Sequence, residues 1–172
     1  MIEIYGMIFT AVIGCLLHFT YEWSGRSFLV TLIAPTNESI FEHLKLLLTP
    51  YLLWMLNEYV RYGRFMENFI LSKLLGVLAG MALIIFGFFA YTALCSRNFL
   101  LADIFLFFLS VAVSFGLSYL LMILPLPAGP AVRIGSDITL ILLILCFAVC
   151  SVFPPKGRLF DVTQGQMPMH SS

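Results

Sequence analysis

The sequence predicts an all-α, polytopic integral membrane protein with five transmembrane helices and a short extramembrane C-terminal tail. Two observations lead to this fold class. Of the 172 residues, 61% are hydrophobic and only 10% are charged, and the mean hydropathy is +1.02. A soluble domain of this length could not bury so much apolar surface. The apolar residues also gather in segments of about 20 residues, the length that about 30 Å of hydrocarbon requires.

The segments can be justified in chain order. The first contains His18 and lacks the basic start and small-residue cleavage site of a secretory signal, so we expect a permanent helix. The second begins with Ser39 and Glu42, which fit a capping box. The last follows the connector "PLPAGP", begins at Ser136 and ends at Phe153, where "FPP" stops it. The predicted helices cover residues 4–21, 39–60, 69–94, 99–124 and 136–153 of one domain, residues 1–155, and residues 156–172 form the tail.

Small residues form a stripe on each of the third and fourth predicted helices. Ser72, Gly76 and Gly80 recur every four residues, a pattern that lets another helix backbone come close. Ser110, Ser114 and Ser118 recur in the same way. We expect both stripes to pack helices, within the chain or across a homo-oligomer, and the alternative is a hydrophilic lining for a solute path.

Polar residues concentrate where the first helix ends, in "HFTYEWSG", and where the second begins, in "NESIFEHLK". His18 and Glu42 lie at about the same depth below one membrane surface if these two helices form an antiparallel hairpin. Glu42 and Lys45 are three residues apart and can neutralise each other. The predicted polar cluster contains His18, Tyr21, Glu22, Asn37, Glu38, Glu42, His43 and Lys45.

These two stretches, with "NEY" at residues 57–59, resemble the signature of a family of small bacterial membrane proteins called domain of unknown function 6512. The residues at the family's motif positions are His18, Tyr21, Glu22, Trp23, Gly25, Asn37, Glu38, Ser39, Glu42, His43 and Lys45. The tail departs from the family, because Arg158, Val162, Gln164 and Met167 replace a proline, a proline, a threonine and a tyrosine. The resemblance implies a multi-helix protein of the cell membrane with a cytoplasmic N-terminus, and it implies no activity.

Three roles remain open for the polar cluster. We expect a structural or accessory membrane component, in which paired charges lock the helices together. One alternative is a role in proton, ion or small-solute transport. The other is a membrane-embedded hydrolase with a divalent metal held by His18, Glu22, Glu42 and His43.

The motifs and the net charge of the sequence argue against several other functional classes. No metalloprotease, serine hydrolase or nucleotide-binding motif occurs, so the sequence favours a protein that is not an enzyme and needs no cofactor. Nine basic and nine acidic residues cancel, which leaves no basic surface for nucleic acid. We therefore expect the lipid bilayer to be the main partner.

Overall fold

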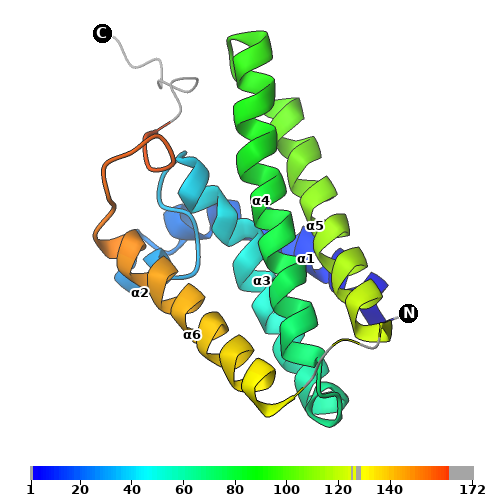
Figure 1. The fold of residues 1–172 in the computed structure, drawn as a ribbon. Helices are drawn as coiled ribbons and strands as arrows, with labels where there is room; N and C mark the ends of the chain where they lie inside the picture. Colours follow the sequence, from blue (N-terminus) through cyan, green and yellow to red (C-terminus); the bar gives the residue numbers. More distant parts are fainter. Residues whose placement is uncertain (1, 125, 127–128, 163–172) are drawn as a thin grey trace, which may run out of the picture.

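The computed structural model describes residues 2–124, 126 and 129–162, and this part of the chain is all-helical. The fold class predicted from composition is therefore correct at the level of secondary structure. Figure 1 shows the arrangement of the helices. The elements are α1 (Ile2–Trp23), α2 (Phe28–Thr31), α3 (Ile40–Arg61), the 3₁₀ turn η1 (Gly63–Phe65), α4 (Phe69–Cys95), α5 (Leu100–Ile123) and α6 (Pro130–Val152).

Four of the described helices, α1, α4, α5 and α6, are long and apolar enough to cross a bilayer. They indicate a protein embedded in a membrane. The remaining long helix, α3, has 22 residues, but its sequence includes Glu42, Lys45, Glu58 and Arg61. Length and composition alone therefore support four spans, one fewer than the sequence analysis expects.

The core of the bundle surrounds α3. This helix packs against α1 and α4, and Figure 1 shows it between its neighbours while α4 and α5 run side by side. Phe147 of α6 stacks on Phe41 of α3 with ring centroids 4.6 Å apart. Leucine, isoleucine and phenylalanine side chains are exposed along α1, α5 and α6, where lipid can cover them. Glu42, Lys45 and Glu58 of α3 are thus buried in protein, while the outer helices carry the apolar surface.

Contacts between helix termini define two ends of the bundle. At the first, which we call the Lys73 end, Glu3 of α1 contacts Lys73 of α4, and Asn68 donates hydrogen bonds to the carbonyls of Leu121 and Met122 in α5. At the other, which we call the His43 end, the end of α1 meets the start of α3 through His18, Glu38 and His43. Tyr91 and Asp103 join the end of α4 to the start of α5 near this second end.

The start of α6 differs from the prediction. The helix begins at Pro130 and not at Ser136, with Gly129 as its N-cap. Proline is favoured in the first turn of a helix, because its fixed φ suits the helix and its missing N–H has no intrahelical acceptor there. The predicted connector "PLPAGP" therefore ends in helix. Ser136 lies inside α6, where its hydroxyl donates to the carbonyl of Val132.

The described part of the tail lies against the start of α3. The backbone N–H of Phe41 donates to the carbonyl of Leu159 at 2.9 Å, and the rings of Phe41 and Phe160 lie 4.6 Å apart. Ser39 and Val162 form an isolated antiparallel bridge. Residues 163–172, which include two of the four departures from the family motif, lie outside the described part.

The two small-residue stripes face each other between α4 and α5. Ser72, Ser110, Ser114 and Ser118 are fully buried. A Cβ atom added to Gly76 would overlap the carbonyl oxygen of Ser114, and one added to Gly80 would overlap the Ser114 hydroxyl. The backbones of α4 and α5 therefore approach so closely that only glycine fits at these two positions.

Replacing Gly80 by leucine should lower the stability of the protein in detergent by about 1–3 kcal/mol, because an overpacked contact forces the backbones apart. Gly116→Leu is the matched control on α5, where an added Cβ would meet nothing within 4 Å. The measurement is thermal or denaturant unfolding followed by circular dichroism. Equal stability of the two variants would contradict the packing role of the stripe.

Candidate functional site

The structure brings together three residues of the predicted polar cluster, and we call them the His–Glu–His cluster: His18, Glu38 and His43. Glu38 Oε2 lies 3.3 Å from His43 Nε2, and Glu38 Oε1 lies 4.0 Å from His18 Nε2. The two imidazole rings are 5.6 Å apart between centroids. One carboxylate thus lies within reach of two histidines from different helices.

Local structure explains this convergence. His18 projects from the penultimate turn of α1, and His43 from the first turn of α3. Glu38 lies in the loop just before Ser39, the N-cap residue whose hydroxyl accepts from the N–H of Glu42 at 3.3 Å. The helix start and the antiparallel α1–α3 packing therefore position all three side chains at the His43 end.

A backbone carbonyl orients His43. Its Nδ1 lies 2.9 Å from the carbonyl oxygen of Ser39. Because a carbonyl oxygen only accepts, Nδ1 carries a hydrogen. Nε2 therefore donates to the ionised Glu38 when the ring is protonated, and it has a lone pair available for a metal when the ring is neutral. A carbonyl that holds the second ring nitrogen of a histidine in this way is typical of metal-binding imidazoles.

The cluster is half-exposed. The side chains of His18, Glu38 and His43 are 36%, 39% and 31% exposed. The hydrogen bond with His43 lowers the pKa of the Glu38 carboxyl, and this effect outweighs the opposing effect of partial burial. Glu38 is therefore an ionised oxygen donor that solvent and small ions can reach.

Two further helices contribute polar groups nearby. Asp103 at the start of α5 interacts electrostatically with both His43 and Glu38. Tyr91 of α4 donates its hydroxyl to Asp103 and also contacts Asn98. The predicted polar cluster does not contain these residues, because helical periodicity does not give the distance of α4 and α5 from α1 and α3.

The donor set suits a divalent transition metal. One nitrogen from each histidine and one oxygen of Glu38 all lie within 4.8 Å of one another. Zinc in proteins takes imidazole nitrogen and carboxylate oxygen at about 2.0–2.2 Å, so small inward side-chain movements would complete three ligands. A fourth position would remain for water or another ligand.

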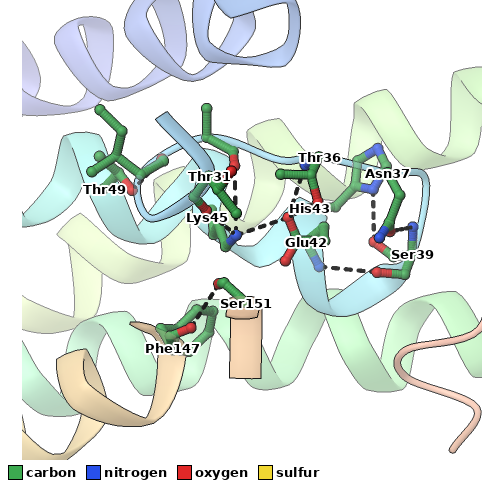
Figure 2. Close-up of polar contacts among 12 residues, drawn as sticks. Thr31, Thr36, Asn37, Ser39, Glu42, His43, Lys45, Thr49, Phe147 and Ser151 are labelled. Carbon is green, nitrogen blue, oxygen red and sulfur yellow. Dashed lines mark hydrogen bonds and ion pairs between the residues drawn. The ribbon is translucent and has the colours of Figure 1, made fainter. Parts of the chain in front are cut away.

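A second polar group lies deeper, and we call it the Glu42–Lys45 pair. Lys45 Nζ lies 2.7 Å from Glu42 Oε2, and these side chains are 1% and 5% exposed. The same ammonium group donates to the carbonyl oxygen of Thr31 at 2.8 Å, while Thr36 donates to Glu42 from both its N–H and its hydroxyl. Figure 2 shows these contacts between α3 and the preceding loop.

This pair fastens the loop to the helix. Lys45 donates to the loop carbonyls of Thr31 and Ala34, and Glu42 accepts from Thr36 of the loop. Thr49 adds a hydrogen bond to the carbonyl of Ile33 at 2.7 Å. The pair is closed to solvent and has its polar contacts within the fold. We interpret it as structural, in contrast to the half-exposed His–Glu–His cluster.

The other residues of the predicted cluster lie outside both groups. Glu22 pairs with Arg26 at 3.4 Å on the surface, where both side chains are more than half exposed. Asn37 accepts a hydrogen bond from the N–H of Ser39, and Tyr21 contributes its backbone carbonyl to the turn after α1. The metal-ligand set considered from the sequence therefore changes, since Glu38 takes the place of Glu22 and Glu42.

Sequence reasoning also misses a buried group at the Lys73 end, the Lys73 triad of Glu3, Glu58 and Lys73. Lys73 Nζ lies 2.7 Å from Glu3 Oε1 and 2.5 Å from Glu58 Oε2. The spacing of Glu58 and Arg61 suggests a surface ion pair, but Arg61 instead donates to Asn57. A lysine inside an otherwise apolar helix was the available signal, because such a charge needs a partner.

Comparison with known proteins identifies the family. A family model described as "Family of unknown function (DUF6512)" matches residues 2–169. The chain belongs to this family. The membership confirms the resemblance seen in "HFTYEWSG" and "NESIFEHLK", and these DUF6512 stretches contain all three residues of the His–Glu–His cluster. Neither a curated protein nor a solved structure matches the chain.

Glu42→Gln should lower the free energy of unfolding by about 3–5 kcal/mol, because it leaves the Lys45 ammonium buried without its counter-charge. Glutamine has nearly the shape of glutamate and can still accept from Thr36, so the variant isolates the charge. Chemical unfolding in detergent measures the change. The control is Glu22→Gln, which removes an exposed charge and should change stability little; a similar loss in both variants would disagree with the structural role.

Proposed function

We propose that this chain is a multi-pass membrane protein with five spans that holds a divalent transition-metal ion at the His–Glu–His cluster. We infer an accessory, non-enzymatic membrane component whose site opens at one membrane face. The observation that carries the proposal is the convergence of His18, Glu38 and His43, with their donor atoms within 4.8 Å of one another.

The contacts of α3 with α1 support the proposed fifth span. The two helices meet at the His43 end through His18 and His43, and Glu3 and Glu58 share Lys73 at the other end. Both have 22 residues, or about 33 Å at the usual rise. Since α3 runs antiparallel to α1 over its full length, it crosses the bilayer wherever α1 does. Glu42, Lys45 and Glu58 are tolerated on such a helix because they are buried against protein partners.

The donor atoms of the His–Glu–His cluster support a bound metal ion more than a simple ion pair between Glu38 and the histidines. A histidine pair around one carboxylate combines two borderline-soft nitrogens with a hard oxygen, the mixture that zinc accepts. The hydrogen bond from His43 Nδ1 to Ser39 fixes its ring for coordination through Nε2. The buried Glu42–Lys45 pair already locks the loop to α3, so the fold does not need the half-exposed cluster for that task.

Purified protein without a histidine tag should bind one Zn²⁺ per chain, and His18→Gln or His43→Gln should weaken binding by more than about tenfold. Binding should also weaken as the pH is lowered, because protons compete with the metal for the imidazole nitrogens. Isothermal titration calorimetry and metal analysis of protein in nanodiscs measure both effects.

The titration needs two controls. The sulfurs of Cys146 and Cys150 lie 4.0 Å apart and could take zinc themselves, so all variants should carry Cys146→Ser. Glu22→Gln removes a carboxylate close in sequence but outside the cluster and should leave binding unchanged. Full zinc binding by the His18→Gln, His43→Gln double variant would exclude the proposed site.

Reporters placed at the N-terminus and after Phe160 should report opposite sides of the membrane, because five proposed spans separate these positions. The family resemblance favours a cytoplasmic N-terminus, although basic residues divide almost evenly between the two ends of the bundle. Alkaline phosphatase and fluorescent-protein fusions measure the two positions. Reporters on the same side would show that one helix does not cross.

A further inference from the structure

The Lys73 triad joins three helices at the end of the bundle opposite the His–Glu–His cluster. Lys73 Nζ from α4 lies 2.7 and 2.9 Å from the two carboxylate oxygens of Glu3 in α1. It lies 2.5 Å from Glu58 Oε2 in α3. A single ammonium group therefore serves two carboxyl groups that come from different helices.

Because the triad is buried, its net charge strongly affects its free energy. The side chains of Lys73 and Glu58 are 0% exposed and that of Glu3 is 13% exposed. The rings of Phe69 and Phe115 lie 5.7 and 5.3 Å from the ammonium nitrogen, so its surroundings are apolar. Two ionised carboxylates with one ammonium would leave an uncompensated negative charge in this environment, which is strongly unfavourable.

The other groups around the triad do not supply a second positive charge among the described residues. Trp54 Nε1 donates to Glu58 Oε1 at 3.0 Å, and the Tyr51 hydroxyl donates to the carbonyl of Lys73. Burial, followed by the charge of Glu58, raises the pKa of the Tyr62 phenol, which stays neutral. Arg61 is turned away and donates to Asn57.

The positions of the oxygens also favour a proton shared by the two carboxyl groups. Glu58 Oε2 and both oxygens of Glu3 lie within 2.9 Å of the same Lys73 nitrogen. A protonated carboxyl group can donate a hydrogen bond, which a carboxylate cannot. A proton held by one carboxyl group would therefore add a donor to the triad and bring its net charge to zero.

We propose that the Lys73 triad is a proton-binding site in which Glu3 and Glu58 share one exchangeable proton. The partly exposed Glu3 in the first turn of α1 connects the site to water at this membrane face. In the protonated state the triad contains one ammonium, one carboxylate and one neutral carboxyl group. Release of the proton adds a negative charge at the junction of α1, α3 and α4, so the contact among these helices responds to pH.

Infrared spectroscopy of the full chain in lipid nanodiscs tests the proposal directly. At neutral pH the spectrum should contain the carbonyl band of a protonated carboxyl group, and the band should shift in D₂O. Either Glu3→Gln or Glu58→Gln should remove this band, because the remaining carboxylate then pairs with Lys73 alone. Glu67→Gln, a change in the exposed segment between η1 and α4, should leave the band in place.

A second measurement follows the triad through the fluorescence of a neighbouring tryptophan. Trp54 contacts Glu58 directly, and Trp23→Phe leaves Trp54 as the only tryptophan. Its fluorescence should change with pH in a single transition, and Glu3→Gln should abolish that transition. Spectra of the wild type and both glutamine variants with the same carboxyl bands, together with Trp54 fluorescence that is unaffected by Glu3→Gln, would overturn the proposal.

Discussion

The whole bundle depends on neutralising the charges of α3 inside an apolar protein. Near its start, Lys45 and Glu42 satisfy each other and the loop before the helix. Near its end, Glu58 meets Lys73, a residue of the next long helix. Each charge would be too costly to expose to hydrocarbon, so each determines which neighbour must lie beside α3 and at what height. The outer helices can then be almost wholly apolar.

The two ends of the bundle use similar residues for different purposes. At the His43 end, half-exposed histidines and Glu38 keep their donor atoms accessible, while the neighbouring Glu42–Lys45 pair is sealed. At the Lys73 end, the acidic groups are buried around one cation. The clusters differ more in their exposure to solvent than in their residue types. The half-exposed cluster can be reached from solvent, whereas the buried groups hold helices together. The close α4–α5 contact keeps both ends in a fixed relation.

Helices were predictable from the sequence because lipid contact imposes long apolar segments, and Ser39 with Glu42 correctly indicated the start of α3. The residues with which each charged side chain pairs were less predictable, because they depend on how the helices are shifted along one another. Helical periodicity links His18 to Glu22, yet the carboxylate near His18 belongs to Glu38, in a loop without periodicity. Likewise, Glu58 pairs with a residue of the next long helix and not with Arg61. Pro130 was read as the end of a connector although it also suits a helix start.

The docking of the tail has a consequence for the order in which the protein matures. The N–H of Phe41 finds its acceptor in Leu159, and Val162 bridges to Ser39 beside Glu38. A ribosome makes these tail residues after all the long helices of the bundle. The backbone N–H of Phe41 therefore lacks this acceptor until the tail has been made. Final shaping of the loop that carries Glu38 is thus a late event in maturation, which follows synthesis of the other helices.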